Sequence, residues 1–143
     1  MKLTPHFSLE ELTVSETAAR KGLDNYPKPD IITELTKLAL FLEDVRTLLG
    51  QAIQINSGYR SPEVNTSVGG SKTSQHCKGQ AADIRVKDVS PDKVMQALIK
   101  SDLQFDQLIR EYDSWTHISI ADKPRRQALI IDKSGTRPYT IKA

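Results

Sequence analysis

The sequence predicts an α+β domain with a small, mostly antiparallel sheet and flanking helices. One long segment in the first half repeats its apolar residues at helical spacing. The segments typical of strands lie mostly in the second half, with helices before and between them. No repeat, low-complexity tract or linker interrupts the 143 residues, which are enough to bury one core. We therefore expect a single domain over residues 1–143.

The helices expected in the first half have clear start and stop signals. Ser8 and Glu11 have the spacing of a capping box, so a short helix is expected after Ser8, and a second helical turn is expected after Ser15. A stretch with one glycine and two prolines then precedes a long helix that begins at Asp30 and ends at Gly50. Its apolar face consists of Ile31, Leu35, Leu38, Leu42, Val45 and Leu49.

The second half is expected to contain strands separated by loops and one helix. A proline after Ser90 marks the start of that helix, whose apolar residues again have helical spacing. The other assignments follow from alternating apolar residues and from clusters of Gly, Ser and Thr. In order, they are a strand within 52–59, a loop over 61–76, a strand at 81–86, strands at 105–111 and 115–121 joined by a turn at 112–114, and a strand or hairpin within 125–143.

Composition excludes several classes of function. The formal net charge is +2 and there is no basic run, so the sequence does not favour nucleic-acid binding. The single cysteine cannot form an internal disulfide, and no apolar stretch reaches the roughly 18 residues of a membrane span. The N-terminus carries Pro, His and acidic residues where a secretory signal is apolar. We expect a monomer synthesised in the cytoplasm without its own export signal.

Three residues in the second half could hold a metal ion. His76 ends a Gly-rich loop, Asp83 lies in the next strand, and His117 lies in the second strand of the later pair. Two imidazoles and one carboxylate are a ligand set of catalytic Zn²⁺, which leaves a fourth position for water. His117 can join the other two only if its strand lies beside that of Asp83. Spacing alone also allows a surface His76, a strand-end Asp83 and a His117 buried in the core.

The motifs around these residues resemble a known family. The segment "INSGYRSPEVNTSVGGSKTSQHCKGQAADI" and the later "WTHISI" are similar to the zinc peptidases of peptidoglycan, the D-alanyl-D-alanine carboxypeptidase and L-alanyl-D-glutamate endopeptidase group, which includes many phage endolysins. Residues 7–27 share the resemblance more weakly. The Ser-x-His-x-x-Gly-x-Ala-x-Asp and Trp-x-His signatures are matched by Ser74, His76, Gly79, Ala81, Asp83, Trp115 and His117.

The resemblance implies a hedgehog/D-Ala-D-Ala peptidase-like fold in which His76, Asp83 and His117 bind zinc. In this family an acidic residue shortly before the last histidine acts as the base. Glu111 and Asp113 are the candidates, and we favour Glu111 because it ends a strand, whereas Asp113 lies in the expected turn. Some relatives have this acid three residues before the histidine, where this chain has Ser114, so the choice stays open.

The resemblance also assigns residues to the substrate. The family's arginine at the position of Arg60 binds substrate and stabilises charge near the reacting carbonyl, for which a planar guanidinium is suited. Ser74 and Gln75 are expected to hydrogen-bond the substrate or a zinc ligand. Cys77 is expected to serve packing, and His6 to lie on the surface.

The function expected from these residues is a zinc metallopeptidase that hydrolyses peptide bonds in the stem peptides or cross-links of bacterial peptidoglycan. A missing export signal would fit a phage endolysin released through a separate pore protein, or a virion-associated enzyme. A host enzyme acting on recycled wall peptides is an alternative. A non-catalytic zinc-containing wall-binding module is another, because hedgehog signalling domains share such zinc folds. The sequence leaves open which bond is cleaved, whether by a carboxypeptidase or by an endopeptidase.

Overall fold

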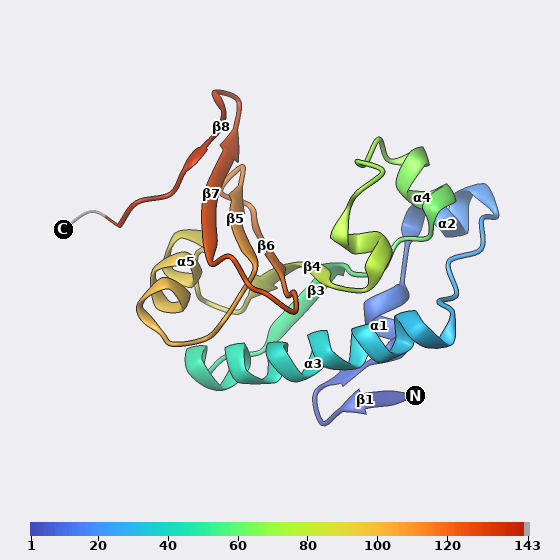
Figure 1. The fold of residues 1–143 in the computed structure, drawn as a ribbon, viewed down its shortest axis with the longest axis horizontal. Helices are drawn as coiled ribbons and strands as arrows, with labels where there is room; N and C mark the ends of the chain where they lie inside the picture. Colours follow the sequence, from blue (N-terminus) through green and yellow to red (C-terminus); the bar gives the residue numbers. More distant parts are fainter. Residues whose placement is uncertain (142–143) are drawn as a thin grey trace.

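The computed structural model describes residues 1–141, and it confirms an α+β architecture (Figure 1). Residues 142–143 of the expected domain lie outside this range. A six-stranded sheet has the order β3-β4-β6-β5-β7-β8, and its neighbours are antiparallel except for β5 and β7. The strands are β3 (Ile53–Ser57), β4 (Ala81–Val86), β5 (Gln107–Glu111), β6 (Trp115–Ser119), β7 (Gln127–Asp132) and β8 (Gly135–Pro138), with a separate hairpin of β1 (Lys2–Thr4) and β2 (Phe7–Ser8).

The helices begin and end where the sequence signals indicate. Ser8 and Glu11 form the expected capping box, and the long helix ends at Gly50, whose φ of 65° is left-handed. Within residues 1–141, no helix combines the length and apolar character needed to cross a membrane. The helices are α1 (Leu9–Thr13), α2 (Glu16–Lys21), α3 (Pro29–Leu49), α4 (Pro62–Ser67) and α5 (Pro91–Lys100), with a 3-10 helix, η1 (Gln75–Lys78).

One face of the sheet contributes to the core. Ile84 of β4, Leu108 of β5 and Ile118 of β6 are fully buried in the same apolar cluster as the inner faces of α3 and α5. Successive side chains of a strand point to opposite faces. Asp83, Ile109 and His117 therefore lie on the other face of the sheet.

The prediction of a loop over 61–76 is wrong in two places, because this segment contains α4 and the start of η1. The side chain of Ser61 caps α4 by accepting a hydrogen bond from the backbone N–H of Val64, and Pro62 follows at the first helical position. Helices of six and four residues are too short to show an apolar period. The β1-β2 hairpin was also not expected from the sequence, whereas the tail forms the expected hairpin as β7 and β8.

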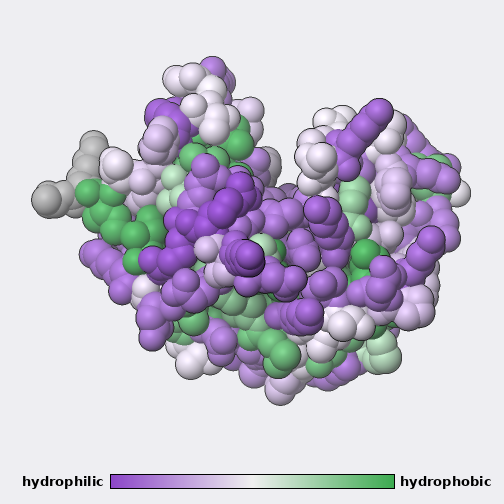
Figure 2. Space-filling model, in the orientation of Figure 1, coloured by the Kyte–Doolittle hydropathy of each residue, from purple (hydrophilic) through white to green (hydrophobic). Residues whose placement is uncertain are grey.

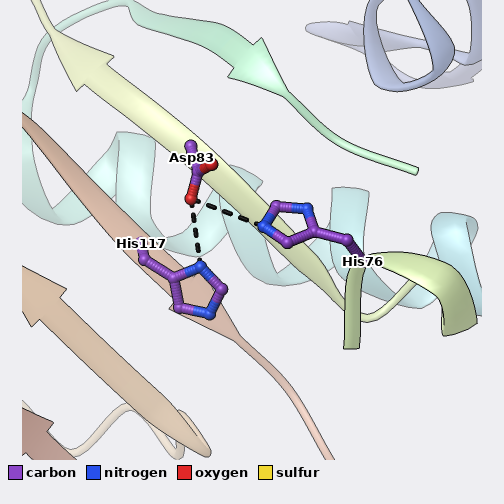
Figure 3. Close-up of side chains that lie close together, drawn as sticks. All are labelled: His76, Asp83 and His117. Carbon is purple, nitrogen blue, oxygen red and sulfur yellow. Dashed lines mark hydrogen bonds and ion pairs between the residues drawn. The ribbon is translucent and has the colours of Figure 1, made fainter. Parts of the chain in front are cut away.

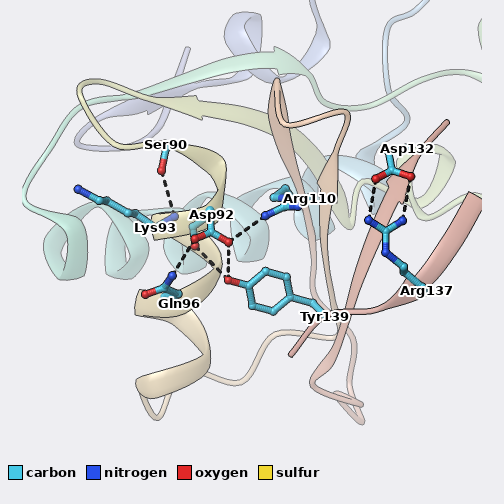
Figure 4. Close-up of polar contacts among 8 residues, drawn as sticks. All are labelled: Ser90, Asp92, Lys93, Gln96, Arg110, Asp132, Arg137 and Tyr139. Atoms are coloured by element: carbon cyan, nitrogen blue, oxygen red, sulfur yellow. Dashed lines mark hydrogen bonds and ion pairs between the residues drawn. The ribbon is translucent and has the colours of Figure 1, made fainter. Parts of the chain in front are cut away.

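Polar contacts attach the C-terminal segment to α5 and close its hairpin (Figure 4). Asp92, in the first turn of α5, accepts hydrogen bonds from Arg110 Nη1 at 2.9 Å and from the Tyr139 hydroxyl at 2.7 Å. Arg137 of β8 donates to both carboxylate oxygens of Asp132 in β7, each at 2.8 Å. These contacts fix β7 and β8 beside β5.

Replacing a buried residue of α3 tests this arrangement. Leu42→Ala should lower the free energy of unfolding by about 2–5 kcal/mol, because it removes a fully buried side chain and leaves a cavity. Leu40→Ala, on the exposed side of the same helix, should change it by no more than about 0.5 kcal/mol. Chemical denaturation measures both. Equal effects would mean that α3 packs through a different face.

Candidate metal centre

Asp83 and His117 are brought together by strand register. In the antiparallel pair of β4 and β6 they are direct partners, and the Asp83 Oδ1 lies 3.0 Å from His117 Nδ1. His76 approaches from η1 and places its Nε2 3.5 Å from the same oxygen (Figure 3). The three candidate ligand atoms all lie within 4.8 Å of one another. The condition set by the sequence, that the strands of Asp83 and His117 be neighbours, is therefore met.

A backbone carbonyl orients His76, whose side chain is almost fully buried. Its Nδ1 lies 2.7 Å from the carbonyl oxygen of Gly58, so this nitrogen carries the hydrogen and donates it. The unprotonated Nε2 then faces Asp83. Such a second contact is the usual way in which a protein fixes the tautomer and the ring orientation of a metal-binding histidine.

Two glycines make the approach of His76 possible. A Cβ on Gly58 would lie 2.4 Å from the carbonyl oxygen of Leu12, so only glycine fits against α1 there. Gly79 ends η1 with a φ of 71°, a conformation that favours glycine, and it turns the chain toward β4. This turn allows His76 and Asp83 to converge.

The surroundings of Asp83 keep its carboxylate ionised. Burial alone would raise the pKa of Asp83, but the contacts of its carboxylate with the imidazoles of His117 and His76 outweigh burial and hold the pKa well below its usual range. The centre therefore offers one anionic oxygen and two imidazole nitrogens. This donor set fits Zn²⁺ and leaves a position for a non-protein ligand.

Glu111 lies beside this centre and Asp113 does not. A cleft of about 680 Å³ is lined by Glu111 together with His76, Asp83 and His117. Asp113 is exposed in the turn after β5 with a φ of 51° and is not among the residues that line this cleft. The structure thus places Glu111, at the end of β5, beside the centre and leaves Asp113, in the following turn, outside it.

The Glu111 carboxylate is held in a partly buried position. Trp115 Nε1 donates a hydrogen bond of 2.7 Å to its Oε2. Burial raises the pKa of Glu111, the negative charge of Asp83 raises it further, and the Trp115 hydrogen bond and the imidazoles offset part of this. A carboxylate whose pKa lies above its ordinary value is better matched to proton transfer near neutral pH.

Arg60, Ser74 and Gln75 all line the same cleft. Arg60 is partly buried, and its Nε has no hydrogen-bond partner within residues 1–141. Ser74 Oγ accepts from the His76 backbone N–H at 3.2 Å, which caps η1. Gln75 Nε2 donates to Asp106 Oδ2 at 3.0 Å and to the Ile120 carbonyl at 3.2 Å. Ser74 and Gln75 therefore already support the backbone around His76.

Sequence reasoning missed an ion pair at the rim of the cleft. Asp106 is almost fully buried, and Arg125 donates to it through Nε at 2.9 Å and Nη2 at 2.7 Å. Arg125 itself is exposed and lines the cleft. No local sequence motif predicts an ion pair between Asp106 and Arg125, which lie 19 residues apart. The bond between Trp115 and Glu111 was also missed, although its tryptophan belongs to the Trp-x-His signature.

The remaining candidates lie outside the centre. Cys77 is half-buried, and burial raises the pKa of its thiol, which agrees with a packing role. His6 lies on the surface as expected, with its Nδ1 2.7 Å from Glu43 Oε1.

Comparison with known proteins identifies a family. The family model described as Peptidase M15 matches residues 5–119, which is most of the chain. The match includes the three candidate ligands and Glu111 and ends at the last residue of β6. A search of the curated proteins finds no match.

Metal content tests the centre directly. The purified protein should contain about one zinc per chain after dialysis, because two imidazoles and a carboxylate form a three-ligand catalytic site. His76→Ala, Asp83→Ala and His117→Ala should each lose the metal. His6→Ala, which changes the remaining histidine, should keep it. Elemental analysis by mass spectrometry measures the content, and full occupancy in Asp83→Ala would remove Asp83 from the ligand set.

Proposed function

Because this chain belongs to the peptidase M15 family, we propose that it is a zinc-dependent peptidase that hydrolyses peptide bonds of bacterial peptidoglycan. Peptidases of this family are zinc-dependent metallopeptidases. The observation that carries the proposal is the convergence of His76, Asp83 and His117 in a cleft that also contains Glu111. Metal ligands, an acid–base group and space for a substrate are what hydrolysis of a peptide requires.

The three ligands would hold zinc between the sheet and η1. A bound zinc ion supplies a Lewis acid that polarises a carbonyl and lowers the pKa of a water molecule to about 7. Asp83 contributes the negative charge that balances part of the charge of the ion. The Gly58 carbonyl keeps His76 in the tautomer that can ligate.

Glu111 acts as the base in this proposal. It accepts a proton from the attacking water and returns it to the amine of the leaving peptide. Trp115 holds Oε2, so the carboxylate stays directed into the cleft. The raised pKa of Glu111 makes its carboxylate a stronger base for the first half of this proton transfer.

Arg60 binds the substrate. Its side chain lines the cleft, where the guanidinium can bind a carboxylate or a developing oxyanion. Ser74 and Gln75 contribute to substrate binding through the shape of the cleft wall, since their hydrogen bonds support η1 and Asp106.

The cellular role belongs to the same proposal. The chain is a monomeric single-domain wall enzyme without a membrane or nucleic-acid partner, of the type used as a phage endolysin or as a virion component. One apolar cluster that includes residues of α1, α3, α5 and the sheet supports a single domain. A non-catalytic wall-binding module is the alternative, and the placement of Glu111 and Arg60 in the cleft favours the enzyme.

Incubation with purified peptidoglycan tests the function. The zinc-loaded protein should release new amino termini, which mass spectrometry identifies, and chelation of the metal should abolish the release. Binding to peptidoglycan without new termini would support the wall-binding module instead.

The proposed role of Glu111 as the base can be tested by replacing each of the two candidate carboxylates with the corresponding amide. Glu111→Gln should keep zinc and fold, because the side chain retains its shape, while kcat falls by about 10²–10⁴-fold through loss of acid–base catalysis. Asp113→Asn should have much less effect, because its side chain lies in the exposed turn. Steady-state kinetics on a stem peptide compares the two. The reverse order of effects would assign the base to Asp113.

The proposed role of Arg60 in substrate binding can be tested by a substitution that keeps its positive charge. Arg60→Lys should leave zinc content and thermal stability almost unchanged but lower kcat/KM at least about tenfold, because an ammonium cannot reproduce the bidentate contact of a guanidinium. Arg20→Lys, on the exposed surface of α2, is the matched control and should retain full activity. Equal rates for wild type and Arg60→Lys would exclude this role.

A further inference from the structure

We infer that the substrate is a peptide chain that continues on both sides of the cleaved bond, so that the protein cuts within a chain and does not trim a terminal residue. The inference rests on the proposed function and decides between its two possible reaction types. It comes from a second cleft that adjoins the metal centre.

The second cleft has a volume of about 610 Å³ and shares Arg60, Asp83 and Trp115 with the first. Asp83, a candidate metal ligand, thus borders both spaces. The residues found only in the second cleft come from the start of α2, from β3 and β4, and from α4. They are Val14, Ser15, Glu16, Thr17, Gln54, Ile55, Asn56, Ser57, Val64, Val68 and Arg85.

Strand register places the second cleft on the same face of the sheet as the metal centre. Arg85 lies two residues after Asp83 in β4, and Gln54 of β3 is its direct partner. The side chain of Arg85 is held at this face by Ser114, whose carbonyl and hydroxyl accept hydrogen bonds at 3.0 and 2.7 Å. The face therefore continues from the metal centre across β4 to β3.

The first and second clefts together form a combined groove, and the walls of this groove stand apart. Residues of β5 line one side of the first cleft, and residues of α2 and α4 line the second. In Figure 1, β5 and the helices α2 and α4 lie on opposite sides of β4. Figure 2 shows the surface hollowed between these two parts of the molecule. An extended chain can lie across such a groove.

The size of the two clefts favours an internal bond. Pockets that enclose a ligand of drug size measure about 300–1,000 Å³, and each of these clefts falls within that range by itself. An enzyme that removes one terminal amino acid needs room for a single residue on one side of the bond. Here a cleft of this size lies on each side of Asp83.

Matched stem peptides with a free or an amidated C-terminus test the inference. Both should be cleaved at the same internal bond with similar kcat/KM, because a chain-cutting enzyme does not need the terminal carboxylate. Asn56→Trp, which adds bulk at an exposed position of the second cleft, should raise KM at least about tenfold without loss of zinc. Val68→Trp on the opposite wall provides a second obstructing variant, and Leu40→Trp on exposed α3 is the control.

The outcomes separate this inference from the proposed function. Cleavage of the free-acid peptide alone, with release of its terminal amino acid, would overturn the inference while the peptidase function stood. Wild-type kinetics in both Asn56→Trp and Val68→Trp would likewise exclude the second cleft. If the zinc-loaded protein released nothing from either peptide or from peptidoglycan, the proposed function would fail and the inference with it.

Discussion

The register between β4 and β6 is the constraint on which the rest of the structure depends. Ile84 and Ile118 point into the core, and their neighbours Asp83 and His117 point to the cleft as direct partners. Because side chains alternate along a strand, a shift of one residue would bury the two polar groups and expose the two isoleucines. The burial of apolar side chains on one face thus fixes the metal ligands on the other.

The third ligand depends on backbone packing outside the sheet. His76 reaches Asp83 because Gly58 brings its carbonyl oxygen to the imidazole, and Gly58 can do so because it lies directly against Leu12 of α1. The N-terminal helix, far away in sequence, therefore contributes to the centre without supplying a ligand. The family match over residues 5–119 includes α1.

The sequence predicted those features that local signals determine. The capping box at Ser8 and the periodicity of α3 depend on neighbouring residues, and the choice of Glu111 over Asp113 as the acid facing the centre follows from the end of a strand and the start of a turn. Features that depend on distant contacts could not be predicted. The parallel pairing of β5 with β7, the pair of Asp106 with Arg125 and the second cleft all join residues far apart in the chain.

The C-terminal hairpin determines where the sheet stops. Without β7, the strand that carries Glu111 would be an edge strand, and its unpaired N–H and C=O groups could bind a strand of another molecule. The hairpin instead makes β8 the edge on this side, where Pro138 lacks a donor and Arg137 adds charge on a fully exposed strand. The strand that carries Glu111 is thereby shielded from edge-to-edge pairing with another molecule.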